Sequence, residues 1–515
     1  MEQFIALHRE SILGVLAGFD RMVFRGSFKS ISYVKGMEIF LSAHGVLLKD
    51  FQRFANRCTA QLSSHAQAVA AKAGRPYRYL ESSGVDKEGL ARSIAEKDGV
   101  KDGLICVLSC VEPCKSFDVY RNQETKHLEL VRRERKCRFF YFYYQHKEFG
   151  LMYVRLQSWL PFDVQVGLNG RSYLARQLDR AGIKYHQSEN CFTWIEDVPR
   201  AQRLLDRLTG LAWVAVLDRL ASAVNPLRRK GQPLAQVFSY YWTMRQSEYA
   251  TDVMFKDRAS LEAVYGALSR YAIEHLHSRD VLRFLGKKAV GRFSQQVTSD
   301  LKERIEGVRV KHHVGSNSIK MYDKQGSVLR IETTINDPSR FRVWRRAQGS
   351  SRSKLAWREL RKNVADIGRR VAICRAANGR YLQALAAVTI SAPAHRVLDP
   401  VNRAVRRDGR SSRGLRLLDP KDVSLFRAVM RGEHLIDGLT NGQLRQALFP
   451  QPARDESERK RRISYVSRQL RLLRAHGLIH KVNQRRLYRI SDKGHQVMSV
   501  TITLHQTETS FTKAA

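Results

Sequence analysis

The sequence predicts a multidomain protein of α/β and α+β class, with an N-terminal α/β region, a central antiparallel basic sheet, a long helix and a small C-terminal helical domain. The chain has 515 residues, which corresponds to roughly three domains at about 100–200 residues each. The run GLICVLSCV (103–111) is apolar on both faces, as in a sheet strand covered by helices. Residues 305–345 alternate strictly between apolar and polar, as in strands with one buried face.

Residues 1–125 are expected to form the α/β domain. A strand runs through GVLAGFDRMVFRGSF (14–28), and helical periodicity follows at 34–45 and 48–73. A short strand, PYRYL, and the helix DKEGLARSIAEK precede the apolar run at 103–111. This alternation of strands and helices favours a sheet with helices packed on it.

Residues 126–300 are expected to form a mixed region. The pattern is that of β-structure from 127 to 168, with a turn at HKEFG, and helical periodicity returns at 171–182, 200–223 and 258–285. The hairpin around 132–159 interleaves arginines with aromatic residues, an arrangement that can stack unpaired bases. The alternative is that most of these rings belong to the core.

Residues 301–390 are expected to combine a basic antiparallel sheet with a long helix. The strands EGVRVKHH, NSIKMYDK and SVLRIETTI put apolar residues on one face and basic residues with one tyrosine on the other. We expect the second face to bind nucleic acid through Arg309, Lys311, Lys320, Tyr322, Lys324 and Arg330.

The long helix is expected at about 354–388. Its apolar seam runs from Trp357 to Leu385 with residues alternately three and four apart, which is heptad spacing. The seam could pair with a second copy of the chain, with Asn378 fixing the register of a homodimer. Alternatively, it packs on its own domain.

The remainder is expected to comprise a basic linker at 391–418, a domain at 419–500 and a tail at 501–515. The domain has three helical segments, DPKDVSLFRAVM, TNGQLRQALF and ERKRRISYVSRQLRLLRAHG. Two short strands, GLIHKV and RRLYRI, and the start of a last helix follow. Leu470, Leu473, Leu478 and Ile479 supply an apolar stripe, and Gly477 ends the third helix in a left-handed cap.

This order of elements, with the third helix ending LxxLRAHGLI before a basic hairpin and YRIS, resembles a winged helix-turn-helix over about 420–500. The resemblance implies nucleic-acid binding by the third helix and the wing. The residues expected to make these contacts are Arg459, Arg461, Arg462, Ser464, Tyr465, Ser467, Arg468 and Arg471 of the helix and Lys481, Arg485 and Arg486 of the wing.

The charge of the chain points to a polyanionic partner. Ninety Lys and Arg against 49 Asp and Glu give a net charge of +41, and for a protein with an ordinary apolar content the usual polyanion is nucleic acid, RNA or DNA. No apolar run is long enough for a transmembrane span, and no secretory signal is recognisable, so we expect a cytoplasmic protein, nucleoid-associated if it binds DNA, with no membrane partner. The seven scattered cysteines are expected to be reduced, and those at 106, 110 and 114 to be buried.

Four carboxylates are candidate catalytic residues. Asp20 lies in an early apolar strand, Glu112 follows the strand at 103–111, and Glu332 and Asp337 lie on and after a third strand. An RNase-H-like nuclease brings such residues together to hold Mg²⁺. Alternatively, Asp20 is a buried carboxylate paired with Arg21 or Arg25.

The central sheet is also similar to the catalytic sheet of rolling-circle replication initiators, through the run I-K-M-Y-D-K and the L-R-I-E after the hairpin. This similarity implies Tyr322 as a nucleophile. Those sheets hold a metal with two histidines that flank one hydrophobic residue, whereas His312 and His313 are adjacent and would face opposite sides of a strand. The alternative is a phosphate-binding platform in which Tyr322 stacks a base.

We therefore expect a nucleic-acid-binding protein, of a bacterial mobile element or ribonucleoprotein, that engages structured RNA or DNA through several basic surfaces. The alternatives are a Mg²⁺-dependent nuclease or transposase-like enzyme and a dimeric DNA-binding regulator. No phosphate-loop motif GxxxxGK[ST] is present, so no ATPase motor is expected. No cofactor is evident apart from Mg²⁺ in the nuclease alternative.

Overall fold

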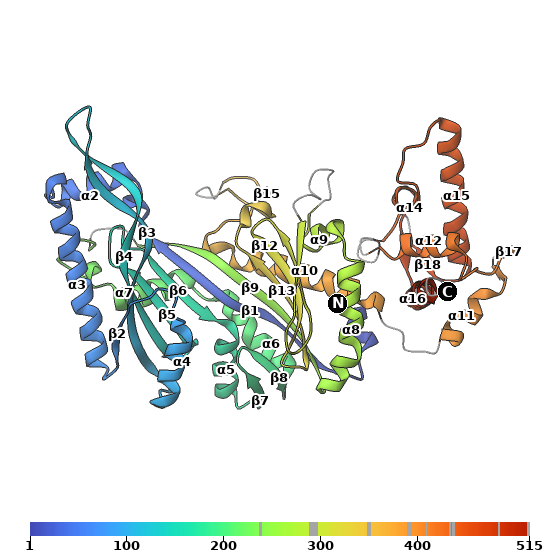
Figure 1. Ribbon diagram of the computed structural model, residues 1–515, viewed down its shortest axis with the longest axis horizontal. Coiled ribbons are helices and arrows are strands. Elements are labelled where there is room, and N and C mark those ends of the chain that lie inside the picture. The colour runs from blue at the N-terminus through green and yellow to red at the C-terminus, as the bar shows by residue number, and fades with distance from the viewer. Residues whose placement is uncertain are drawn as a thin grey trace. The chain divides into compact units, whose positions relative to one another are not determined.

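The computed structural model describes residues 1–235, 239–287, 297–347, 352–388, 394–407, 409–431, 434, 438–482 and 485–511. The chain forms two compact units, each built from separate stretches of sequence (Figure 1). Unit 1 comprises Met1–Gly14, Asp252–Glu332 and Ala376–Ala515, and unit 2 comprises Val15–Thr251 and Thr333–Arg375. Each unit therefore combines parts of several of the consecutive domains expected from the sequence.

Unit 2 is a sheet with helices. Its elements are most of β1 (Ile12–Ser27), α2 (Val34–Ala43), α3 (Phe51–Lys72), β2 (Tyr77–Leu80), α4 (Lys87–Lys97), β3 (Gly103–Arg121), β4 (Leu128–His146), β5 (Gly150–Gln157), β6 (Val164–Asn169), α5 (Gly170–Ala181), β7 (Tyr185–Ser188), β8 (Cys191–Ile195), α6 (Val198–Arg207), α7 (Trp213–Val224), most of β9 (Tyr241–Phe255), β14 (Arg342–Arg345) and β15 (Ala356–Glu359). The strand order is β9-β1-β6-β5-β4-β3-β2, in which β2 is parallel to β3. The mixed α/β character expected from the sequence is confirmed at this level.

The apolar run at 103–111 lies in β3 as expected. All seven cysteines are free and buried, and α3 and α4 pack against β3. Most aromatic residues of the hairpin around 132–159 are core residues; Phe139, Phe140, Phe142 and Tyr143 of β4, for example, are all at most 4% exposed. They are therefore not available to stack unpaired bases.

Unit 1 contains a smaller antiparallel sheet and a C-terminal module. Its elements are α1 (Glu2–Leu7), α8 (Arg258–Glu274), α9 (Ser278–Phe284), β10 (Val297–Lys302), β11 (Arg309–Val314), β12 (Asn317–Lys324), most of β13 (Val328–Ile335), α11 (Ala394–Asn402), β16 (Val405–Arg407), β17 (Arg410–Ser412), α12 (Pro420–Val429), α14 (Asn441–Leu448), α15 (Glu456–Ala475), β18 (Ile479–Lys481), β19 (Tyr488–Ile490) and α16 (Asp492–Phe511). The strand order is β10-β11-β12-β13, so the strands expected at 305–345 are present. The expected alternation between a buried and a partly exposed face holds in β11, whereas every residue of β13 is buried.

The long helix is shorter in the structure than the range 354–388 expected from the sequence. Residues Ala356–Glu359 form β15, which pairs with β14, and α10 spans only Ile367–Leu385. Asn363 sets the start, because its side chain accepts a hydrogen bond from the backbone N–H of Ala365 in the 3-10 turn that leads into the helix. The seam residues of α10 are buried within the chain, for example Cys374 and Tyr381 at 0% exposure. A second copy is therefore not needed to cover them, and the homodimer remains a prediction.

The basic linker expected at 391–418 is largely folded. Residues 391–393 and 408 lie outside the described residues, but α11 and the β16–β17 hairpin occupy most of the rest. Val401 and Leu415 are buried in the core that also contains Leu470 and Leu473 of α15. The start of the expected tail at 501 likewise continues α16 to Phe511, and residues 512–515 lie outside the described part.

The C-terminal module has the elements expected in the order expected. Three helices, α12, α14 and α15, precede the β18–β19 hairpin and α16. Gly477 adopts φ 72°, the left-handed cap predicted for the end of the third helix. The apolar stripe is also confirmed, since Leu470, Leu473, Leu478 and Ile479 are all buried. Within the described residues, no helix is long and apolar enough to cross a membrane.

Candidate active site

Asp20 lies in the interior part of β1 and is held by two side-chain amides. It is 3% exposed, and its carboxylate accepts hydrogen bonds from Asn169 Nδ2 (2.9 Å) and Asn190 Nδ2 (2.6 Å). Arg25, one of the two arginines considered as a partner for Asp20, forms an ion pair with Asp163 instead. Both of these donors are neutral side-chain amides.

The amide of Asn169 is oriented by the start of α5. Its Oδ1 accepts the backbone N–H groups of Arg171 (2.7 Å) and Ser172 (3.1 Å), so it caps the helix. With the oxygen fixed in this way, the Nδ2 of the same amide must point toward Asp20. The Asn-Gly pair that ends β6 and begins α5 therefore positions the Asp20 carboxylate together with Asn190.

Glu248 is the second carboxylate, on β9. It is partly exposed, and its Oε1 accepts a hydrogen bond from Gln246 Nε2 (3.1 Å). Asp20 and Glu248 both line a cavity of about 190 Å³ within unit 2. The other lining residues are mostly polar and include Arg21, Arg92 and Tyr153. Glu88 is a third carboxylate in this lining, and a small polar cavity with several carboxylates can admit a hydrated ion.

Glu332 is the third carboxylate, and its side chain is fully buried. Tyr322 Oη donates a hydrogen bond to its Oε2 (2.8 Å), and Lys320 Nζ lies 2.7 Å from its Oε1. Both partners come from β12, beside β13 in the unit 1 sheet. Glu332 is followed by Thr333, where β13 continues into unit 2.

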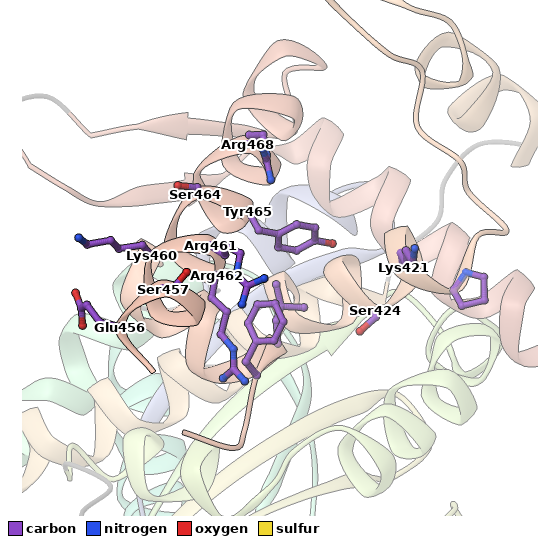
Figure 2. Close-up of a pocket in the computed structure, with 13 residues that line it drawn as sticks. Lys421, Ser424, Glu456, Ser457, Lys460, Arg461, Arg462, Ser464, Tyr465 and Arg468 are labelled. Atoms are coloured by element: carbon purple, nitrogen blue, oxygen red, sulfur yellow. The ribbon is translucent and has the colours of Figure 1, made fainter. Parts of the chain in front are cut away.

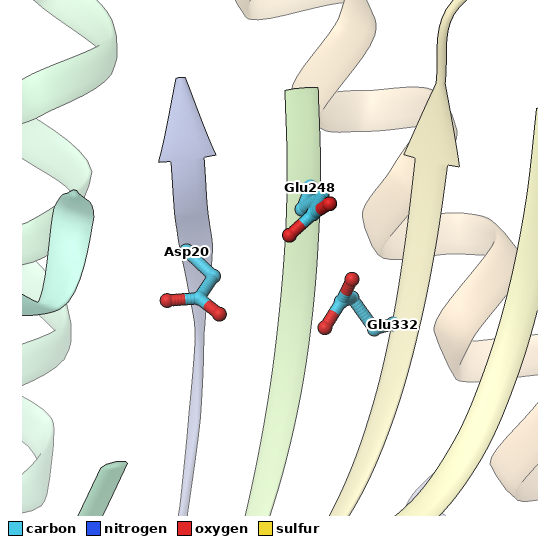
Figure 3. Close-up of side chains that lie close together, drawn as sticks. All are labelled: Asp20, Glu248 and Glu332. Atoms are coloured by element: carbon cyan, nitrogen blue, oxygen red, sulfur yellow. The ribbon is translucent and has the colours of Figure 1, made fainter. Parts of the chain in front are cut away.

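The three carboxylates form one cluster. Asp20, Glu248 and Glu332 each offer an oxygen atom, and these atoms lie within 4.8 Å of one another. Figure 3 shows the three side chains on β1, β9 and β13. This is the only group of three or more His, Cys, Asp and Glu ligands of that kind found among the described residues.

The donor set fits a hard divalent cation. Mg²⁺ takes oxygen ligands at about 2.0–2.1 Å in octahedral geometry, so that its ligand atoms lie about 3–4 Å apart. The oxygen atoms of the three residues lie within 4.8 Å of one another, which is close to the spacing that one such ion requires. Three carboxylates at these distances repel one another, and a divalent ion would relieve that repulsion.

Glu112 and Asp337, the other two expected carboxylates, have structural roles. Glu112 accepts a hydrogen bond from Tyr141 Oη (2.7 Å) and forms ion pairs with Arg155 and Lys87. Burial alone would raise its pKa, but the hydrogen bonds and the Arg155 charge outweigh burial and hold the pKa at about 2. Asp337 caps the 3-10 turn Pro338–Arg340 by accepting the backbone N–H of Ser339 (3.1 Å). Neither belongs to the cluster.

The basic face expected on the central sheet is partly buried. Arg330 is 0% exposed and forms two hydrogen bonds with Asp252, of 2.6 and 2.9 Å. It is therefore a core ion pair and not a phosphate contact. Tyr322 is 8% exposed and Lys320 is engaged by Glu332, so a surface platform for bases is excluded at Tyr322.

The ends of the same sheet are more open. Arg309 is paired with Asp300 (2.7 Å), while Lys311 and Lys324 are partly exposed. The two adjacent histidines face opposite sides as expected. His312 is buried against Ser299 Oγ (2.7 Å), and His313 Nε2 lies 2.6 Å from Asp300.

The C-terminal module presents most of its expected contact residues to solvent. Arg461, Ser464, Arg468 and Arg471 are exposed on α15 at spacings of three and four, which places them on one side of the helix. Ser467 is also exposed, as are Lys481, Arg485 and Arg486 of the β18–β19 hairpin. Arg459 and Arg462 form ion pairs with Glu456 and Glu458 of the same helix.

A hollow of about 1120 Å³ borders this helix. Figure 2 shows Lys460, Arg461, Tyr465 and Arg468 of α15 in its lining, with Lys421 of α12 also present. The ring of Tyr465 contacts Phe449 edge-on. The lining therefore combines apolar residues, such as Leu448 and Phe449, with several cationic ones.

Glu248 was missed in the sequence. The signal that could have found it is the run YWTMRQSEYATDVMF, in which Trp242, Met244 and Tyr249 are buried core residues of β9. An acidic residue inside such an apolar strand indicates a functional site as strongly as Asp20 does.

No family model, curated protein sequence or solved structure matches this chain.

Proposed function

We propose that this protein is a Mg²⁺-dependent enzyme that cleaves or transfers phosphodiester bonds of nucleic acid. The observation that carries the proposal is the cluster of Asp20, Glu248 and Glu332, whose oxygens lie within 4.8 Å of one another, in a chain with a net charge of +41. Carboxylates that converge at neighbouring strands are the common ligands of metal-dependent nucleases. A strongly cationic chain favours a polyanionic substrate.

The residues of the cluster have distinct roles. Asp20, Glu248 and Glu332 would hold Mg²⁺, which would polarise a phosphoryl oxygen and lower the pKa of a bound water. Asn169 positions the Asp20 carboxylate through its hydrogen bond. Lys320 lies 2.7 Å from Glu332 and balances part of the negative charge. Tyr322 orients Glu332 by donating a hydrogen bond to its other oxygen.

Binding of nucleic acid by the C-terminal module is part of the proposal. The order of helices, hairpin and last helix supports a winged helix-turn-helix in which α15 enters a groove. The exposed arginines on one side of α15 and the basic hairpin support phosphate contacts on both sides of that groove. This module would hold the substrate, and the carboxylate cluster would perform the chemistry.

Cleavage assays with matched variants test the proposal. Purified protein is incubated with labelled single-stranded, duplex and structured RNA and DNA, with Mg²⁺ or with EDTA. We expect cleavage or strand joining only with Mg²⁺, and a loss of at least about 100-fold in Glu248→Gln and Asp20→Asn, because each removes a ligand that acts on the transition state.

Glu96→Gln is the matched control, since Glu96 is exposed on α4 and carries the same charge change. It should retain full activity. A wild-type protein that binds these nucleic acids but alters none of them would contradict the enzyme proposal and favour a binding protein or regulator. Activity that survives in Glu248→Gln would contradict the assignment of the site.

A further inference from the structure

Two tryptophans stand side by side on the surface of unit 2. Trp344 on β14 and Trp357 on β15 are direct cross-strand partners in the two-stranded sheet labelled at β15 in Figure 1. They are 52% and 62% exposed, and their ring centroids lie 5.7 Å apart at an interplanar angle of 65°. Three of the other tryptophans, Trp159, Trp213 and Trp242, are at most 6% exposed.

The exposure of the pair follows from the register of the small sheet. The pairing puts Arg342, Trp344, Trp357 and Glu359 on one face, while Val343 and Arg345 point to the other. Val343 and Arg345 are 7% and 8% exposed, so their face is the one that packs on the protein.

Arg345 fixes this orientation. Its guanidinium donates hydrogen bonds to the backbone carbonyl of Glu359 (2.8 Å from Nη2) and to that of Arg346 (2.9 Å from Nη1). It also lies 3.7 Å from Asp366, next to the start of α10. The sheet is thus anchored through one face and holds both tryptophans toward solvent on the other. Such large exposed rings normally mark a binding surface.

The surroundings of the pair are cationic. A hollow of about 370 Å³ is lined by Trp357 together with Arg342, Arg345 and Arg358, and Glu359 is its one acidic lining residue. Arg342 and Arg346 are exposed on either side of Trp344 along the strand. Flat aromatic surface combined with arginines matches a ligand that has flat rings and negative charge at regular intervals.

Nucleic acid with unpaired bases has these properties. Each base has a π-face that stacks on an aromatic side chain, and each phosphate can form an ion pair with a nearby arginine. The bases of a duplex are stacked on one another and expose only their edges, so they cannot stack on the faces of the tryptophan rings. An apolar protein partner would carry no negative charges to pair with the arginines around the two tryptophans.

We propose that Trp344 and Trp357 form a platform on which unpaired bases of a single-stranded segment stack, with Arg342 and Arg346 contacting the adjacent phosphates. This inference rests on the proposed function and specifies its substrate: a nucleic acid that is single-stranded over at least part of its bound length.

Binding measured without divalent ions tests the platform separately from the enzyme proposal. Fluorescence anisotropy of a labelled oligothymidylate, in EDTA, is compared with that of an abasic strand of equal length. We expect Trp344→Ala and Trp357→Ala each to weaken binding of oligothymidylate by about 5- to 150-fold. Both should leave binding of the abasic strand unchanged. Trp357→Phe should recover most of the affinity, because a ring remains.

Tyr33→Ala is the control, since Tyr33 is 54% exposed on the same unit but lies outside this sheet; it should bind as the wild type does. Equal affinity of the wild-type protein for the base-containing and abasic strands would overturn the platform. So would tryptophan variants that bind oligothymidylate normally, or that lose duplex binding to the same extent. A wild-type protein that prefers bases but cleaves nothing would overturn the enzyme proposal alone.

Discussion

Replacing Glu248 by glutamine should stabilise the protein in the absence of metal. Two carboxylate charges within 4.8 Å of each other repel with about 1 kcal/mol in bulk water and about 3.5 kcal/mol at an effective dielectric constant of 20. Glu248 is partly exposed, so its repulsion with Asp20 falls between these limits. Glutamine keeps the size of the side chain and an oxygen that accepts the hydrogen bond from Gln246. We therefore expect Glu248→Gln to raise the free energy of unfolding by about 1–3 kcal/mol.

Mg²⁺ should make the wild-type protein more stable than Glu248→Gln. A ligand that binds only the folded protein stabilises it by about 2.7 kcal/mol at one hundred times its dissociation constant. The wild-type protein should gain this stabilisation and Glu248→Gln should lose most of it. Urea-induced unfolding followed by circular dichroism, with EDTA and with increasing Mg²⁺, measures both effects.

The control for this experiment is Glu96→Gln, which has the same change in charge on the surface of α4. Its stability in EDTA should stay within about 0.5 kcal/mol of the wild type, as for most surface substitutions. A Glu248→Gln protein that is less stable than the wild type in EDTA would refute the repulsion argument. Equal stabilisation of both proteins by Mg²⁺ would refute the role of Glu248 as a ligand.

Three further outcomes are expected elsewhere in the chain. Arg330→Ala should lower the free energy of unfolding by about 3–5 kcal/mol in denaturant titrations, because it breaks a buried ion pair with Asp252; weaker nucleic-acid binding at unchanged stability would contradict this. Burial lowers the pKa of His312 from 6.5 to about 4, so the unfolded chain takes up a proton first as the pH falls. Stability should then decrease by about 3 kcal/mol between pH 6.5 and 4 on account of this residue, and His312→Asn should show a correspondingly smaller decrease in the same titrations. Arg468→Ala on the exposed side of α15 should reduce the slope of log K against log salt by about 0.9 for duplex DNA of any sequence; an unchanged slope would exclude a phosphate contact there.

Local sequence patterns predicted the local elements well. The capped helices, the short strands and the Gly477 cap of the C-terminal module depend on neighbouring residues, and each lies where the pattern placed it. The strands at 305–345 were equally clear from their period of two, although the burial of both faces of β13 was not predicted. The helix at 354–388 was overestimated, since heptad spacing from Trp357 onward cannot reveal that β15 pairs with β14.

The carboxylate cluster and the buried ion pairs could not be predicted in full, because they depend on contacts between residues far apart in the sequence. Asp20 and Glu332 were recognised as polar residues in apolar strands, but their partner Glu248 is 228 and 84 residues away from them along the chain. Glu112 occupies a similar local context, yet Arg155 on β5, two strands away in the sheet, and Lys87 of α4 form ion pairs with it. Arg330 alternates with the apolar residues of its strand as an exposed residue would, but it is buried in an ion pair with Asp252 on β9.

The most direct test of the carboxylate cluster as a metal site is anomalous X-ray scattering from crystals of the protein soaked in Mn²⁺, which takes the same oxygen ligands as Mg²⁺. We expect an anomalous peak within about 2.5 Å of the carboxylate oxygens of Asp20, Glu248 and Glu332 in the wild-type protein, and none there in Glu248→Gln. A wild-type crystal saturated with Mn²⁺ that shows no peak at these three residues would contradict the assignment of the site.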